Sequence, residues 1–222
     1  MNGKLIVLEG IDGSGKSTQF SRLRDRLDAE NIQFHHIIFP RYDNPSSALL
    51  RMYLGGEFGQ NPSDVNEYAA STFYAVDRYA SFHTDWREEY QSGRLILSDR
   101  YSTANAVHQG AKAPADGLDA FLDWLYDFEH RKLGLPAPDV VIYLDVDLET
   151  ALARMRERQA RTETQGDIHE NDVRYLEKCI NAGGHAAARY GWRRVDCGGR
   201  DRLRGIDEIH EEIYAIVKEC LQ

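Results

Sequence analysis

The stretch "EGIDGSGKST", which runs from Glu9 to Thr18, determines which fold this chain can adopt. The pattern G-x-x-x-x-G-K-[ST] is matched by Gly10, Gly15, Lys16 and Ser17. Glycines let the chain curl so that successive backbone N–H groups point inward at a phosphate. The apolar run "LIVLE" comes directly before the loop, and a helical segment follows it. This order predicts a phosphate-binding loop rather than a glycine-rich turn that binds nothing.

The loop also predicts how a nucleoside triphosphate is held. Lys16 is expected to reach the β- and γ-phosphates, and the Ser17 hydroxyl is expected to hold Mg²⁺. The N-terminus of the following helix adds partial positive charge. We therefore expect ATP to contact Gly10, Ile11, Asp12, Gly13, Ser14, Gly15, Lys16, Ser17 and Thr18.

One residue does not suit an anion-binding loop, because Asp12 carries a negative charge. It cannot face the triphosphate without repulsion. We expect it to point out of the loop, toward an uncharged donor such as a sugar hydroxyl or a metal-bound water. The chain has no N-K-x-D motif, which a GTPase should carry, and adenylate kinases have proline where Asp12 stands. Asp12 thus indicates a second substrate beside the nucleotide.

The composition is that of a globular protein with one domain over residues 1–222 and a buried core. Hydrophobic residues make up 42% and charged residues 28% of the chain. The net charge of -9 gives no general attraction to nucleic acid or to an anionic membrane, so we expect neither as a partner. Three cysteines without metal spacing, no signal peptide and no long apolar run favour a cytoplasmic protein.

Apolar runs alternate with segments of helical periodicity. The candidate strands are residues 4–10, 34–39, 94–99, 139–146 and 192–197, and the clearest candidate helices are 65–86, 118–132 and 206–221. Such alternation predicts an α/β fold with a parallel sheet. The polar, arginine-rich segment "RERQARTETQGD", residues 156–167, breaks the pattern. It is either a solvated surface loop or a mobile lid, placed at approximately 155–170, that closes over a charged ligand.

A second set of polar groups follows the predicted strand 94–99. Ligands of an open α/β sheet bind at the carboxyl ends of its strands, and Asp99 and Arg100 lie there beside the phosphate loop. An arginine in this place suits bidentate phosphate binding. The alternative is a structural ion pair between these two residues.

Two pairs of residues are spaced to contact a planar base. Tyr74 and Arg78 lie four apart on a predicted helix, so one can stack while the other donates, unless they form a solvated face. Asn105 and Gln109 also share a helix face, and their amides can read base edges. His108 between them is equally well explained as a ligand-binding or a core histidine.

Taken in order, these motifs resemble thymidylate kinase, a nucleoside monophosphate kinase of the P-loop class. The resemblance covers almost the whole chain: the phosphate loop, "FPRY" at 39–42, the helix with "DR" at 77–78, "DRY" at 99–101 and the arginine-rich segment. It implies a three-layer P-loop NTPase fold with a five-stranded parallel sheet flanked by helices. It also implies the reaction ATP + dTMP → ADP + dTDP with Mg²⁺ in a homodimer.

The resemblance implies a set of dTMP-binding residues: Asp12, Arg41, Tyr42, Tyr74, Arg78, Arg100, Asn105, His108, Gln109 and Asp167. Arg100, assisted by Arg41, would hold the phosphate. Tyr74 would stack on thymine while Arg78 meets a base oxygen, and Asp12 would accept the 3′-hydroxyl. Some family members have tyrosine where His108 stands.

The resemblance also implies the metal ligands and the catalytic groups. The metal would contact Ser17, Asp99 and Glu170, and the catalytic groups would be Lys16, Asp99, Arg100, Arg158 and Arg161, with Arg154 stacked on adenine. The phosphate loop carries no arginine, so the lid must supply the cation for the transition state, from Arg156, Arg158 or Arg161. Asp167 and Glu170 are equally well explained as a capping box.

Two rival functions stay open on sequence alone. A deoxynucleoside kinase would need a carboxylate base near the end of the second or third strand, whereas the arginines at 41 and 100 favour an acceptor that already carries phosphate. A P-loop module that binds nucleotide without turnover would not need the acceptor residues.

Overall fold

The computed structural model describes residues 2–114, 116–162, 172–198 and 204–222. Its sheet has five parallel strands in the order β2-β3-β1-β4-β5. The strands are β1 (Leu5–Glu9), β2 (Phe34–Ile38), β3 (Leu95–Asp99), β4 (Val140–Asp145) and β5 (Arg193–Asp196). Each lies within one of the five apolar runs, so the predicted five-stranded parallel sheet is confirmed.

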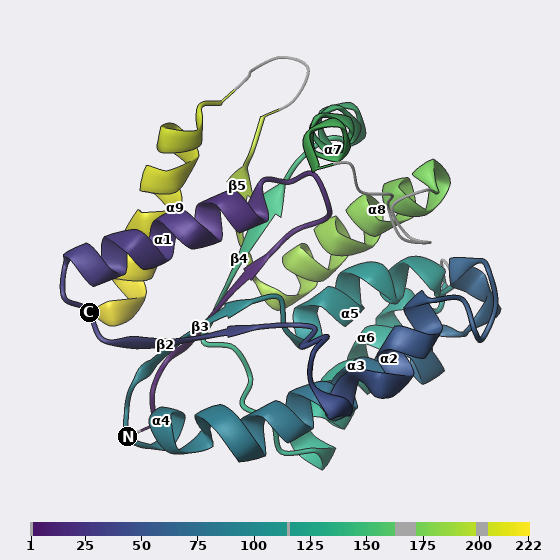
Figure 1. The fold of residues 1–222 in the computed structure, drawn as a ribbon, viewed down its shortest axis with the longest axis horizontal. Helices are drawn as coiled ribbons and strands as arrows, with labels where there is room; N and C mark the ends of the chain where they lie inside the picture. Colours follow the sequence, from purple (N-terminus) through teal and green to yellow (C-terminus); the bar gives the residue numbers. More distant parts are fainter. Residues whose placement is uncertain (1, 115, 163–171, 199–203) are drawn as a thin grey trace.

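Helices cover both faces of the sheet, which gives the three layers expected of a P-loop NTPase (Figure 1). They are α1 (Lys16–Ala29), α2 (Ala48–Leu54), α3 (Glu67–Ser81), α4 (Arg87–Gln91), α5 (Ser102–His108), α6 (Leu118–Tyr126), α7 (Leu148–Thr162), α8 (Val173–Tyr190) and α9 (Ile206–Leu221). α1 and α9 lie together on one side, and α3, α5, α6 and α8 lie on the other. No helix in the described part of the chain is long and apolar enough to cross a bilayer.

The alternation of side chains along β1 divides the core. Leu5 and Val7 pack in a cluster with Phe82 and Trp86. Ile6 and Leu8, on the opposite face of the strand, belong to the larger core that α1 and α9 complete. All five residues of β1 are buried, as expected of a central parallel strand. The strand therefore fixes the position of the phosphate loop at the carboxyl edge of the sheet.

The predicted helix over 65–86 is interrupted. α3 ends at Ser81, a π-helical segment spans Phe82–Trp86, and α4 follows. The apolar residues at helical spacing do not all face the core, because Val76 and Tyr79 are 52% and 43% exposed. The inner side of α3 instead buries Arg78, whose charge needs a partner inside the protein.

Two further segments differ from the sequence interpretation. The long helix α8, which the sequence analysis did not identify, packs on α5 and β4 through Tyr175 and Leu176 and through small residues such as Cys179, Ala182 and Ala186. Residues 156–162 form the last turns of α7 rather than a loop. The rest of the expected lid, residues 163–170, lies outside the described residues.

The two adjacent glycines of α8 give a matched test of its packing on β4. A Cβ at Gly183 would lie 2.3 Å from the hydroxyl of Tyr143, whose ring is buried, whereas a Cβ at Gly184 would meet nothing within 4 Å. We expect Gly183→Ala to lower the free energy of unfolding by about 1–3 kcal/mol through overpacking. Gly184→Ala should raise it by about 0.5–1 kcal/mol, because alanine favours the helix. Urea unfolding measures both, and equal effects would contradict this packing.

Candidate active site

The phosphate loop joins β1 to α1 and keeps its shape through glycine. Gly13 and Gly15 have φ angles of +83° and +91°, in the left-handed region. A Cβ at Gly13 would lie 2.3 Å from the carbonyl oxygen of Ala151 on α7, so glycine is required there for space as well. A cavity over the loop is lined by Ile11, Asp12, Gly13, Ser14, Gly15, Lys16, Ser17, Thr18, Arg154, Arg158 and Arg204. Gly10 lies buried beneath the loop.

Arginines from two parts of the chain border this cavity. Arg154 donates to the carbonyl oxygens of Ser14 at 3.2 Å and Cys197 at 3.0 Å, so it connects α7, the loop and the end of β5. Arg204, which the sequence analysis missed, donates to the carbonyl oxygen of Asp196 at 2.6 Å. No motif marks Arg204, because only the fold brings the start of α9 beside the loop. Nothing is described of the Arg161 side chain.

Two ion pairs join the phosphate loop to the end of β3. The Lys16 ammonium donates to the Asp99 carboxylate, and an Arg100 guanidinium N–H donates to Asp12 Oδ1 at 2.6 Å. Asp99 and Arg100 therefore do not pair with each other, as the structural alternative had supposed. Arg100 has a φ angle of +62°, and this turn of the backbone separates the two side chains.

The partner of Asp12 corrects one expectation. Its carboxylate does point out of the loop, but it meets the charged Arg100 rather than an uncharged donor. Burial raises the pKa of Asp12, yet the positive charges of Arg100 and Lys16 outweigh burial and lower this pKa to about 2. Burial likewise opposes the charge of Arg100, but the carboxylates of Asp12 and Glu9 raise its pKa above the usual range.

Glu9 is a second residue that the sequence analysis missed as part of the site. It is fully buried at the end of β1, where its carboxyl accepts from Gly10 N at 3.0 Å and from the Thr103 hydroxyl at 2.7 Å. Burial raises its pKa despite the nearby Arg100 and Lys16. Glu9 thus connects the first residue of the phosphate loop to α5. The quoted stretch begins with this residue, but only its position beneath the loop shows what it contacts.

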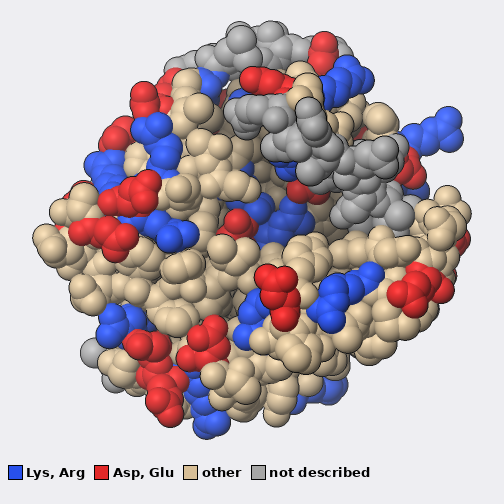
Figure 2. Space-filling model, viewed as in Figure 1, with Lys and Arg blue, Asp and Glu red and all other residues tan. Residues whose placement is uncertain are grey.

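A second cleft adjoins the loop cavity, and Asp12 lines both. Figure 2 shows basic side chains gathered in the hollow at the centre of this face, beside acidic ones. The cleft brings together all the described dTMP-site candidates except one: Asp12, Tyr42, Tyr74, Arg78, Arg100, Asn105, His108 and Gln109. We call it the acceptor cleft. The candidate that does not line it is Arg41, which donates from Nε to Asp77 at 3.2 Å. Asp167 lies outside the described residues.

Arg78 is neither solvated nor free of partners. Its side chain is buried and forms two hydrogen bonds to the Glu129 carboxylate, with 2.9 Å between Nε and Oε2. It also donates to the carbonyl oxygen of Tyr101 at 3.4 Å. Removing one partner of such a buried pair leaves an uncompensated charge, which costs about 3–5 kcal/mol. The pair therefore fixes the guanidinium at the wall of the acceptor cleft.

His108 holds the other side of Arg100. Its Nε2 lies 3.1 Å from an Arg100 nitrogen, and its Nδ1 lies 3.7 Å from the Cys179 sulfur. Because an arginine can only donate, His108 Nε2 accepts, and the imidazole is neutral with its hydrogen on Nδ1. Gln109, next in the chain, is buried with its side-chain oxygen unpaired among the described residues.

The residues at the loop fit a magnesium ion bound together with phosphates. The described residues contain no group of three or more acidic, histidine or cysteine side chains suited to a metal. Mg²⁺ usually takes only one or two protein oxygens and fills its other positions with phosphate and water. The exposed Ser17 hydroxyl and the Asp99 carboxylate beside Lys16 are such oxygens. Glu170 lies outside the described residues.

Comparison with known proteins identifies the family. The model of the thymidylate kinase family matches residues 8–182. The chain belongs to the thymidylate kinase family. Thymidylate kinases are phosphotransferases that use ATP to convert dTMP to dTDP. The chain is 31% identical to the thymidylate kinase of Mycobacterium tuberculosis over 205 residues, which cover 91% of this chain and 92% of that protein.

Human thymidylate kinase is 27% identical over 220 residues, with 99% of this chain and 92% of the human protein covered. The structure of the Candida albicans thymidylate kinase superposes with a TM-score of 0.72 at 24% identity, over 98% of this chain and 92% of that one. The fold of the described part of this chain is therefore that of a thymidylate kinase.

The ion pair of Asp12 predicts how stability depends on pH. A carboxyl whose pKa is lowered on folding stabilises the protein fully above its unfolded pKa, about 4, and this contribution is lost as the pH falls through the folded value of about 2. The difference in unfolding free energy between the wild type and Asp12→Asn should therefore be largest near pH 6. Roughly half of this pH-dependent part should be gone at pH 3. Urea unfolding between pH 3 and 6 measures it, and a difference that grows as the pH falls would contradict the pair.

Proposed function

We propose that this chain transfers the γ-phosphoryl group of ATP to dTMP and releases ADP and dTDP, as a step in dTTP synthesis. The observation that carries the proposal is the junction of two cavities. The loop cavity is lined by the phosphate loop, the acceptor cleft is lined by arginine, aromatic and amide side chains of the kind expected around a nucleoside monophosphate, and Asp12 lines both. The two nucleotides would then lie end to end, with their phosphates meeting between Lys16 and Arg100.

The donor would be held by main-chain N–H groups of the loop and by Lys16. The side chain of Lys16 is already aimed by Asp99 and needs little reordering when a phosphate arrives. Arg154 and Arg158 of α7 border the same cavity, so besides Lys16 they are cations that could stabilise the charge that develops on the transferring group. Between Arg158 and Arg161, the position of Arg158 on this cavity makes it our choice for the catalytic arginine of the lid.

The acceptor phosphate would bind Arg100 in competition with Asp12. A phosphate and a carboxylate are both bidentate acceptors for a guanidinium, so dTMP can replace the carboxylate on one edge. Asp12 would then be free to accept the sugar 3′-hydroxyl. The attacking phosphate oxygen has a second pKa of about 6 and is already ionised near neutral pH. No general base is therefore needed, and catalysis consists of positioning and electrostatic stabilisation.

Three further features belong to the proposal. Mg²⁺, held by Ser17, Asp99 and the phosphates, would neutralise charge on the transferring group when bound. The exposed side chains of Tyr68, Val76 and Tyr79 on α3 favour a homodimer, because burying them in a partner's surface removes apolar area from water. A net charge of -9 argues against nucleic acid as a partner, and the expected compartment is the cytoplasm. All these parts would act within a single domain.

The test of the proposed function is ADP release in a coupled assay with dTMP, dUMP, UMP, dGMP and thymidine as acceptors. We expect the highest kcat/KM with dTMP. A preference for thymidine over dTMP would point to a deoxynucleoside kinase and overturn the acceptor assignment. Release with none of the five would point to a binding module without turnover.

Replacement of the loop lysine should remove turnover. In Lys16→Ala the cation that contacts the transferring phosphates is lost, and we expect kcat to fall at least about 100-fold. Lys4→Ala, which removes an exposed lysine paired with Asp139, is the control and should leave kcat unchanged. Unfolding curves establish that both variants are folded. Full activity of folded Lys16→Ala would rule out phosphoryl transfer at this loop.

Loss of Arg100 should affect the acceptor more than the donor. We expect Arg100→Ala to raise KM for dTMP and to lower kcat, because the phosphate loses a bidentate partner, while KM for ATP changes little. Arg22→Ala removes an exposed arginine of α1 that is paired with Asp207 at the start of α9, and serves as the control. Initial rates with each substrate varied in turn separate the two effects. A change confined to KM for ATP would contradict the assignment of Arg100.

A further inference from the structure

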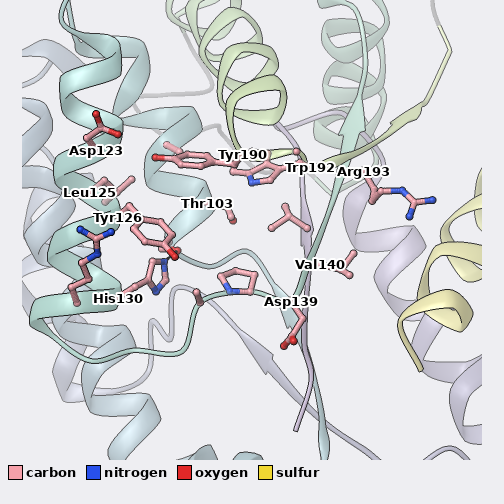
Figure 3. A pocket seen from close by; sticks show the side chains of 17 residues that line it. Thr103, Asp123, Leu125, Tyr126, His130, Asp139, Val140, Tyr190, Trp192 and Arg193 are labelled. Carbon is pink, nitrogen blue, oxygen red and sulfur yellow. Dashed lines mark hydrogen bonds between the residues drawn. The ribbon is translucent and has the colours of Figure 1, made fainter. Parts of the chain in front are cut away.

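A third cavity lies behind α5, on the other side of this helix from the acceptor cleft. Figure 3 shows the side chains that line it. Its volume is about 760 Å³, within the range of pockets that bind small molecules. α5 is a shared wall, because Ser102, Thr103 and Ala106 line this cavity while Asn105 and His108 line the acceptor cleft. We call the cavity the rear pocket. Nothing in the phosphoryl transfer described above uses it.

Aromatic rings form one wall of the rear pocket. Tyr190 stacks with Tyr126, with 6.2 Å between ring centroids and 26° between planes, and with Trp192 at 6.1 Å and 24°. Figure 3 shows Tyr190 and Trp192 along one edge of the pocket, with Tyr126 and His130 on the adjoining side. Pro138 also lines the pocket. Nearly parallel rings favour a flat aromatic ligand, because it can stack against them with large contact area.

The polar groups deep in the rear pocket are acceptors. His130 Nδ1 lies 3.1 Å from the carbonyl oxygen of Leu135, so it carries the hydrogen, and Nε2 then accepts from the Ser102 hydroxyl at 3.2 Å. The Thr103 hydroxyl donates to Glu9 at 2.7 Å. Burial lowers the pKa of His130, which agrees with a neutral ring. Ser102 and Thr103 have thus used their only hydrogens and retain lone pairs.

The charged groups of the rear pocket do not suit an anion. Arg193 donates to Glu219 at 2.8 Å, and Arg131 lies over the Tyr126 ring at 5.8 Å. The side chains of both arginines are at least half exposed, so water screens them. The carboxylates of Asp123 and Asp139 also line the pocket, and a carboxylate can accept several hydrogen bonds at once. Both carboxylates lie at the exposed rim of the pocket, where Asp123 pairs with Arg189 and Asp139 with Lys4, so the buried acceptors are the hydroxyl oxygens of Ser102 and Thr103.

We propose that the rear pocket is a binding site for a flat heteroaromatic molecule that carries N–H donors and no negative charge. The ring would stack against Tyr190 and Trp192, and its amino group would donate to the hydroxyl oxygens of Ser102 and Thr103. This ligand class differs from both substrates of the proposed reaction, because ATP and dTMP are anions. The site would be filled at the same time as the nucleotide sites, since α5 separates it from the acceptor cleft.

The test uses two probes that differ mainly in charge. 4-Aminoquinoline and quinoline-4-carboxylate have the same ring system, and both are titrated into the full chain saturated with dTMP and a non-hydrolysable ATP analogue. Calorimetry measures the affinities. We expect the amine to bind at least about tenfold more tightly than the carboxylate. The amino group donates hydrogen bonds to the hydroxyl oxygens, whereas the carboxylate has no hydrogen to donate and its negative charge is repelled by these oxygens. No binding of the amine, or equal affinity for both probes, would overturn the proposal.

A pair of variants locates the site. Ala137 lines the rear pocket on a half-buried loop, so Ala137→Trp should fill the pocket and weaken binding of the amine at least about tenfold. Ala29→Trp adds the same ring at the exposed end of α1 and should leave binding unchanged. Unchanged binding in Ala137→Trp would place the probe elsewhere and overturn the proposal. The comparison of the two probes on the unmodified chain does not depend on either variant.

Discussion

The ion pair between Asp12 and Arg100 is the interaction on which the rest of the site depends. β1 and β3 are parallel neighbours, and Leu8 of β1 lies opposite Asp99 of β3. Both strands therefore end side by side at the carboxyl edge of the sheet, which brings Asp12 and Arg100 together. The phosphate loop leaves β1 there, and Arg100 follows β3 in a left-handed backbone conformation. The phosphate loop and the acceptor cleft are consequently joined by the Asp12–Arg100 pair. A substitution of either residue therefore changes the contacts of the other.

Each arginine around the acceptor cleft has its own carboxylate, but the pairs differ in burial. Arg78 and Glu129 are both buried, so neither charged group can replace its partner with water. This pair therefore fixes the wall of the acceptor cleft. Arg100 and Asp12 are each about one-fifth exposed, and this pair can open when a phosphate competes for the guanidinium. Arg41 is held away from the cleft by Asp77, so it would have to change partners to reach the same phosphate. An acidic protein can in this way keep basic groups ordered where an anion arrives.

Local patterns predicted the parts of the fold that depend on neighbours in sequence. The five strands, the phosphate loop and helix α9 follow from apolar runs, glycine spacing and periodicity. The contacts made across long stretches of chain could not be predicted in the same way. Glu129 lies 51 residues from Arg78, and Arg204 reaches the loop cavity only through the docking of α9. Helix α8 was missed although its buried residues recur at helical spacing, because four of the seven are alanine or glycine and do not stand out as an apolar stripe.

The coupling between Asp12 and Arg100 is tested most directly by a double-mutant cycle in kcat/KM for dTMP, with Asp12→Asn, Arg100→Met and the double variant. If the two side chains act on the acceptor as one unit, their effects are not additive, and the coupling free energy is at least about 1 kcal/mol. Effects that add within about 0.3 kcal/mol would show that the two residues act independently and that the loop and the acceptor cleft are not joined in this way.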